Sequence, residues 1–239
     1  MRIEIIEDPP PYTRDAVVDT ITPILGSHLI SQDIGRYIHA SSQVSLPRRA
    51  SSQIRSWAAR LSDNPLWIQG PAETPYPSKA MLTGLAITRQ YHPSISHFCS
   101  TRPPSGGGGG AAPNTCREML ADMFKQLIVE LVFALPDEIY TTIDLSASRF
   151  EVLAQPEVDV SAVLGLLKDV RLLSRHEEIN CIIEGVQLLE NRDDMCHTRN
   201  LERTLRLIME IMKTCFTSDG YVNILNDLVE CGRVIKVYV

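Results

Sequence analysis

Residues 66–99 read LWIQGPAETPYPSKAMLTGLAITRQYHPSISHFC, and this stretch decides the fold. Its first four residues form an apolar run that stops at Gly70, which predicts a short strand. Ser78 can cap a helix that continues to about Tyr91. Residues 95–99 form a second apolar run, which predicts another strand. A strand, a helix and a strand in this order form the repeating unit of a parallel sheet.

The same alternation continues along the chain and predicts an α/β fold, with a parallel sheet covered by helices on both faces. The strongest helical pattern covers residues 115–135, where apolar side chains recur every four residues from Met119 to Leu135. Residues 139–145 fit either a strand or a loop. Further helices are expected at residues 15–30 with interruptions at Pro23 and Gly26, 51–61, 160–173 and 198–216, and further strands at 3–6, 179–184 and 234–239.

The chain divides into two regions by composition. Residues 1–49 contain a Pro-rich segment and are expected to form a helical or irregular lead-in, whereas residues 50–239 are expected to form the core. Within the core, residues 106–110 are five successive glycines, the most flexible linker composition. A glycine-rich phosphate cradle would lead directly into a helix that begins with Lys and Ser/Thr, and no such helix start follows here. We therefore expect a flexible surface insertion.

Composition excludes several classes of protein. The 239 residues, of which 44% are hydrophobic, are enough for one large domain with or without a small appendage. A net charge of −6 argues against nucleic acid or a membrane surface as the partner. The sequence has neither an apolar run of ~18 residues nor a signal-peptide pattern, so we expect a cytoplasmic protein. The six cysteines lack zinc-site spacing, so we expect reduced thiols and no bound metal.

The order of these elements and the amino-acid sequence at two points resemble the fungal NACHT-like P-loop NTPase domain of the STAND class, the nephrocystin-3-type N-terminal module. The two points are LWIQGP at residues 66–71 and NCIIEGVQLLE at residues 180–190. The resemblance covers roughly residues 50–239 and implies a P-loop NTPase-like parallel sheet flanked by helices, incomplete at its C-terminal end. In that family the first point continues as Gly-Pro-x-Gly-x-Gly-Lys-Ser/Thr, and the second is a strand that ends Asp-Gly-Leu-Asp-Glu-Cys.

The first motif of the family is incomplete in this chain, because several of the residues it requires are absent. A phosphate loop needs glycines that let backbone N–H groups converge on an anion, a Lys for the phosphates and a hydroxyl for Mg²⁺. Here no glycine follows Gly70 before the expected helix, three prolines remove donors, and Glu73 brings a negative charge. Lys79 comes nine residues after Gly70, and the next residue, Ala80, has no hydroxyl. A relic of anion binding would rest on Gly70, Ser78 and Lys79.

The second motif is eroded in parallel. The resemblance places Glu184 where the family has the acid that holds Mg²⁺. Gln187 and Leu188 stand where the family has its second Asp and Glu, and neither can act as a base. Glu190 lies nearby but is displaced along the chain.

These observations predict a truncated, non-catalytic NACHT-like domain that acts in protein interaction or regulation and needs no cofactor. Full-length NACHT or STAND relatives are one class of partner that the resemblance implies. The alternative is a divergent ATPase or GTPase that binds ATP or GTP with Mg²⁺ weakly through Gly70, Ser78, Lys79 and Glu184. A third interpretation is a fragment of a longer gene product with no function of its own.

One short motif lies outside the resemblance. The segment Pro9-Pro10-Pro11-Tyr12 fits the Pro-Pro-x-Tyr pattern that WW domains bind. A polyproline segment is already extended, so it loses little entropy when Pro9, Pro10 and Tyr12 enter an aromatic groove. A WW-domain protein is therefore a second candidate partner.

Overall fold

The computed structural model describes residues 11–25, 37–72, 76–99, 115–155 and 157–239 of the chain. Its central sheet has five strands in the order β3-β5-β6-β2-β7, and every neighbouring pair is parallel. The α/β prediction is therefore confirmed, and the sheet is compatible with a P-loop NTPase-like fold. The strands are β2 (Leu66–Gly70), β3 (Ser94–Phe98), β5 (Asn180–Glu184), β6 (Lys213–Asp219) and β7 (Ile235–Tyr238).

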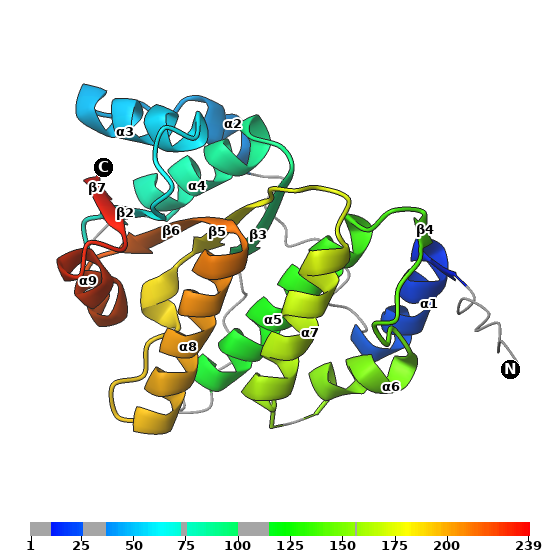
Figure 1. Cartoon of the computed structure of the whole chain (residues 1–239). Helices are drawn as coiled ribbons and strands as arrows, with labels where there is room; N and C mark the ends of the chain where they lie inside the picture. Colours follow the sequence, from blue (N-terminus) through cyan, green and yellow to red (C-terminus); the bar gives the residue numbers. More distant parts are fainter. Residues whose placement is uncertain (1–10, 26–36, 73–75, 100–114, 156) are drawn as a thin grey trace, which may run out of the picture.

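Helices cover both faces of the sheet (Figure 1). Side chains alternate between the faces along each strand, so Leu66 and Ile68 pack with α3 on one face, whereas Trp67 and Phe216 belong to the larger core on the other. The first face carries α2 (Ile38–Ser42), α3 (Arg48–Ala58) and α4 (Lys79–Gln90), and the second carries α5 (Thr115–Phe133), α7 (Val160–Leu173), α8 (Met195–Ile211) and α9 (Asn223–Glu230).

The larger core is built around α5. Met123, Leu127 and Leu131 are completely buried, as their four-residue spacing predicts. Each such side chain contributes about 2 kcal/mol by leaving water. The lead-in helix α1 (Arg14–Leu25) packs into the same core through Val17 and Ile21. The remaining short elements are β1 (Tyr12–Thr13), β4 (Glu138–Ile139), α6 (Ala147–Phe150) and two 3₁₀ turns, η4 (Glu151–Leu153) and η5 (Val186–Leu188).

The structure corrects one expected element. The helix expected over residues 198–216 ends at Ile211, and residues 213–219 form β6. The reason is the place of β6 in the sheet, because a central parallel strand is buried on both faces and residues 214–218 are all buried, so no two-residue alternation marks it in the sequence. The apolar residues of β6 happen to continue the helical spacing of α8, so the boundary is hidden in the pattern. Strand β6 lies in the middle of the sheet.

Other expectations need smaller adjustments. Helix α1 continues through Pro23 to Leu25, so the expected interruption at Pro23 is wrong. Of residues 139–145, only Ile139 lies in a strand, where it pairs with Tyr12. The strand expected at residues 3–6, the glycine run at 106–110 and the interruption at Gly26 fall outside the described residues. In the part of the chain that is described, no helix has the length and apolar character needed to span a bilayer.

Candidate functional site

The sheet has a point where its connections reverse direction. From β2 the chain crosses through α4 on one face, and from β6 it crosses through α9 on the other (Figure 1). Strands β2 and β6 are neighbours, and their last paired residues are Gly70 and Asp219. In open α/β sheets, ligands bind outside the carboxyl ends of the strands at such a point. The carboxyl ends of β2, β5 and β6 are therefore the candidate functional site.

The start of α4 lies at this site, and its N-terminus is capped by a side chain of the same segment. Ser78 is the N-cap residue and is 2% exposed. Its Oγ accepts a hydrogen bond of 3.0 Å from the Met81 N–H, and its carbonyl accepts one of 3.0 Å from the Leu82 N–H. Lys79 begins the helix and is exposed, and Ala80 is buried beside it. Ser78 is thus confirmed as the helix cap, and its side chain occupies the Met81 N–H, which is one of the N–H groups that an anion would need.

A carboxyl group of the protein itself lies at the same helix start. A Cβ built on Gly70 would be 3.0 Å from Asp219 Oδ1 and 3.3 Å from the Ala80 Cβ, so a side chain there would require these neighbours to shift by a few tenths of an ångström. Burial raises the pKa of Asp219, and a hydrogen bond with the Ser78 side chain opposes this rise. The positive end of a helix dipole favours an anion, and Asp219 lies in that position at the start of α4.

Glu184 is the second acid at this end of the sheet. It is the last residue of β5 and is 1% exposed. The register pairs Glu184 with Thr217, and Asp219 lies two residues further along the same strand. All three residues are therefore on the sheet face that α4 covers. The structure brings Gly70, Ser78 and Glu184 to one end of the sheet, as the resemblance implied.

Buried oxygen atoms without hydrogen-bond donors gather at this end. Six buried side-chain nitrogen or oxygen atoms in the described residues have no hydrogen-bond partner, and four of them are oxygens on or directly after β2, β5 and β6. Phosphate groups are held by convergent donors, and three of these four oxygens can only accept, whereas the Thr217 hydroxyl can also donate. The four atoms are Gln69 Oε1, Gln187 Oε1, Thr217 Oγ1 and Asp219 Oδ1.

Glu190, the acid that lies nearby but displaced along the chain, has a structural role here. Glu190 accepts hydrogen bonds from the Ile224 N–H at 3.0 Å through Oε1 and from Asn223 Nδ2 at 3.1 Å through Oε2. Both oxygens are therefore engaged at the first turn of α9, where a carboxylate stabilises the unsatisfied N–H groups. Gln187 and Leu188 lie in η5, directly after β5. None of the three is a base at the carboxyl end of β5.

Asp219 and Thr217 are the site residues that sequence reasoning missed. They end β6, whose first four residues were expected to be the end of a helix. The available signal was a polar Thr-Ser-Asp-Gly sequence at residues 217–220, directly after an apolar run. Gly220 has a φ of 88°, a conformation that favours glycine and ends the strand.

The Pro-Pro-x-Tyr segment is only partly described. Pro9 and Pro10 lie outside the described residues. Tyr12 pairs with Ile139 in the small antiparallel sheet of β1 and β4, and its side chain packs against the larger core. A WW domain would therefore have to separate Tyr12 from these contacts.

No group of three or more His, Cys, Asp or Glu side chains suited to a metal ion is found among the described residues. Comparison with protein-family models and with curated proteins finds no match to this sequence.

Proposed function

We propose that this chain is a NACHT-like domain that does not hydrolyse nucleotide and acts as a protein-interaction or regulatory module. The observation that carries the proposal is the contact of Asp219 with Gly70 and Ser78 at the start of α4. A nucleotide phosphate would have to occupy the same place, and it would meet a negative charge rather than donors.

The arrangement of the other groups supports the same conclusion. The Met81 amide donates to the Ser78 side chain, which removes one donor from the helix start. Lys79 is exposed at that start. Hydrolysis also needs a group that positions water, and both oxygens of Glu190 are engaged by α9.

A second candidate is a divergent ATPase or GTPase, and one observation favours it. Glu184 is buried at the carboxyl end of a central strand, and Thr217 Oγ1 and Asp219 Oδ1 lack donors on the neighbouring strand. Oxygen ligands of this kind suit Mg²⁺. In this alternative a nucleotide would bring the cation, and Lys79 would bind its phosphates.

Titration calorimetry of the full chain with millimolar ATP or GTP and Mg²⁺ separates the two candidates. We expect no saturable binding by the natural protein or by Lys79→Ala. Saturable binding that Lys79→Ala abolishes would establish the nucleotide-binding alternative. Lys168→Ala, a change on α7 away from the site, is the matched control for loss of one lysine.

The interaction role has its own test. Full-length NACHT-like relatives are the partner class we propose, and a WW domain is the second. We expect purified NACHT-like domains to bind the full chain with micromolar affinity in the absence of nucleotide. Binding that requires added ATP would contradict a nucleotide-independent module.

A further inference from the structure

The segment from α2 to the end of α3 carries a charge opposite to that of the whole protein. Residues 37–61 contain four arginines and no Asp or Glu, in a chain with a net charge of −6. All four arginines are exposed. Arg60 is paired with Glu178 at 2.8 Å, but Arg48, Arg49 and Arg55 form no salt bridge with any acid that the structure describes. Three uncompensated guanidinium groups therefore lie on α3.

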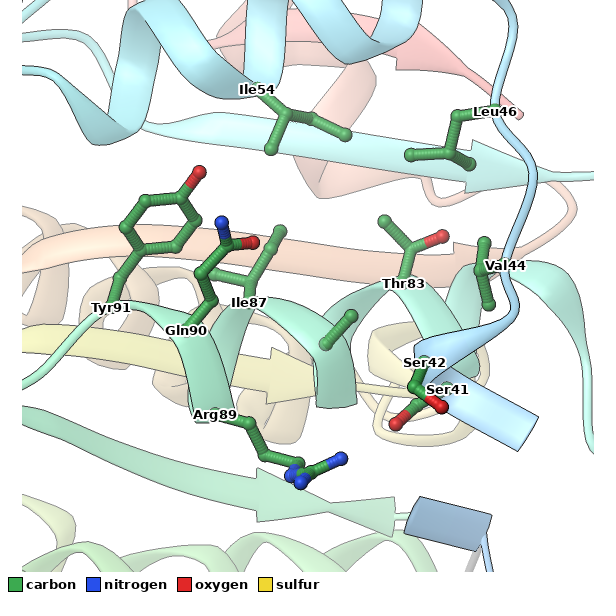
Figure 2. Close-up of a pocket in the computed structure, with 11 residues that line it drawn as sticks. Ser41, Ser42, Val44, Leu46, Ile54, Thr83, Ile87, Arg89, Gln90 and Tyr91 are labelled. Carbon is green, nitrogen blue, oxygen red and sulfur yellow. The ribbon is translucent and has the colours of Figure 1, made fainter. Parts of the chain in front are cut away.

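The first turn of α3 is poorly stabilised. Its N-cap is Pro47, which provides no side-chain acceptor, and its first turn contains no acid. Arg48 and Arg49 instead place two positive charges at the positive end of the helix dipole, which is unfavourable. By contrast, side chains cap α4, α7 and α8. Residues 44–47 before α3 have no regular secondary structure, and contacts here come from Leu46 and Ile54, which line one pocket (Figure 2).

The serine at this helix start follows two arginines directly. The sequence reads Arg48-Arg49-Ala50-Ser51. Ser51 is partly exposed, and its N–H donates to the Pro47 carbonyl at 2.9 Å, which is the helix bond that an extended conformation would break. Charge patterns next to a serine are what many kinases read in a substrate. An arginine pair fits a kinase whose peptide groove is lined with carboxylates.

We propose that Ser51 is a phosphorylation site for a serine kinase that recognises arginines two and three residues before its target. In the reaction, Ser51 Oγ attacks the γ-phosphorus of ATP and a new O–P bond forms. The bond between that phosphorus and the β–γ bridging oxygen breaks, ADP leaves, and the hydroxyl proton passes to the base of the kinase. The site lies on α3 and is independent of the nucleotide question at α4.

Two arginines of the folded protein lie on the same helix face as Ser51, within reach of a phosphate there. Arg48 and Arg55 lie three residues before and four residues after Ser51, so both share its helix face. Arg55 Nε already donates to the Ser51 carbonyl at 3.3 Å. A phosphate on Ser51 adds nearly two negative charges and three acceptors within reach of these guanidinium groups. It would supply the anion that the first turn of α3 lacks and would neutralise most of the arginine charge.

The test is phosphorylation of the folded full chain by an arginine-directed serine kinase with ATP, with sites mapped by mass spectrometry. We expect one phosphate on Ser51, none on Ser51→Ala, and a rate at least about tenfold lower for the Arg48→Ala, Arg49→Ala double variant. Arg199→Ala, a change of an exposed arginine on α8, should leave the rate within about twofold. An acid-directed kinase should not modify Ser51.

Two results would overturn the proposal. One is phosphate that maps to Ser52, or to Ser148 on α6, which has no arginine before it, with Ser51 unmodified. The other is a rate that the double arginine variant does not change. Hydrogen exchange supplies the second measurement, because amides of residues 48–51 should exchange several-fold more slowly in the phosphorylated chain. Unchanged or faster exchange would contradict the role of the phosphate in stabilising α3.

Discussion

The two ends of the central sheet differ in which kind of buried polar atom lacks a hydrogen-bond partner. Among the described residues, four buried oxygens at the carboxyl end have no hydrogen-bond partner. At the amino end, the atoms without partners in that part of the chain are donors, Trp57 Nε1 and Lys213 Nζ. The Lys213 ammonium lies 5.1 Å from the Trp57 ring centre, and burial lowers its pKa.

The difference supports the proposal that the site does not bind phosphate. An anion needs donors at the point where the chain connections reverse, and that point has Asp219 and Glu184 instead. The buried cation is at the first residue of β6, at the other end of the strand that Asp219 terminates. A strand of seven residues spans about 20 Å, so Lys213 cannot compensate the acids.

The largest expected effect comes from Glu190 at the carboxyl end. Glu190→Ala leaves the Ile224 N–H and Asn223 Nδ2 without their carboxylate, which should lower the free energy of unfolding by about 3 kcal/mol. Denaturant unfolding measures the change. Glu202→Ala, which removes an exposed pair with Arg206, should change stability by less than about 0.5 kcal/mol. Equal effects of the two changes would contradict a structural role for Glu190.

The next effect depends on pH and concerns Glu130 on α5. Its carboxylate accepts the Ser96 N–H at 2.6 Å and Gln126 Nε2 at 2.7 Å, and burial raises its pKa to about 7. Because the folded value is raised, stability is full below the unfolded pKa of about 4.3 and falls as pH rises to 7, by on the order of 2 kcal/mol.

Glu130→Gln should remove this decrease between pH 4 and 7, as measured by unfolding at several pH values. Glu210→Gln, a change of an exposed acid, should keep the dependence of the natural protein. A Glu130→Gln curve parallel to that of the natural protein would show that Glu130 titrates normally.

A smaller effect is expected at Asp219, the centre of the carboxyl-end cluster. Its pKa is raised, so its ionised form destabilises the fold above that pKa and not below the unfolded value of about 3.9. Because Asp219 is only half-buried and solvent screens its charge, Asp219→Asn should increase stability at pH 7 by less than about 1 kcal/mol and leave it unchanged at pH 3. Thermal unfolding at both pH values checks this, with exposed Asp227→Asn as control. Destabilisation at pH 7 would mean that the carboxylate is favourably bound.

The smallest effect is expected at Lys79. The side chain is exposed at the start of α4, so Lys79→Ala should change the free energy of unfolding by less than about 0.5 kcal/mol. A loss of 2 kcal/mol or more would reveal a buried role for the ammonium that exposure does not suggest.

The sequence was sufficient for elements whose period is clear. Helix α7 has its predicted bounds, and α4, α5 and β5 differ from prediction by one or two residues, because apolar spacing and the Ser78 cap define them. Strand β6 could not be predicted, since its apolar residues keep the spacing of α8.

Because strand β6 was not predicted, the part of the candidate site that lies at its end was not recognised. Glu184 follows directly from its position at the end of an apolar run, whereas Asp219 depends on the register between β2 and β6, which only the fold provides. The two hydrogen bonds from α9 to Glu190 likewise join residues that are 33 and 34 positions apart in the chain, so the sequence alone does not reveal them. The sequence shows which acids lie near this end of the sheet, but it does not show which other residues they contact.

The most direct test of the central claim is a crystal structure of the full chain grown with a millimolar non-hydrolysable ATP analogue and Mg²⁺. We expect no nucleotide at the start of α4, with the Asp219 carboxylate in contact with Gly70 and Ser78. A triphosphate bound by the amides of that helix start, with Asp219 displaced and a cation next to Glu184, would contradict the proposed inactive domain.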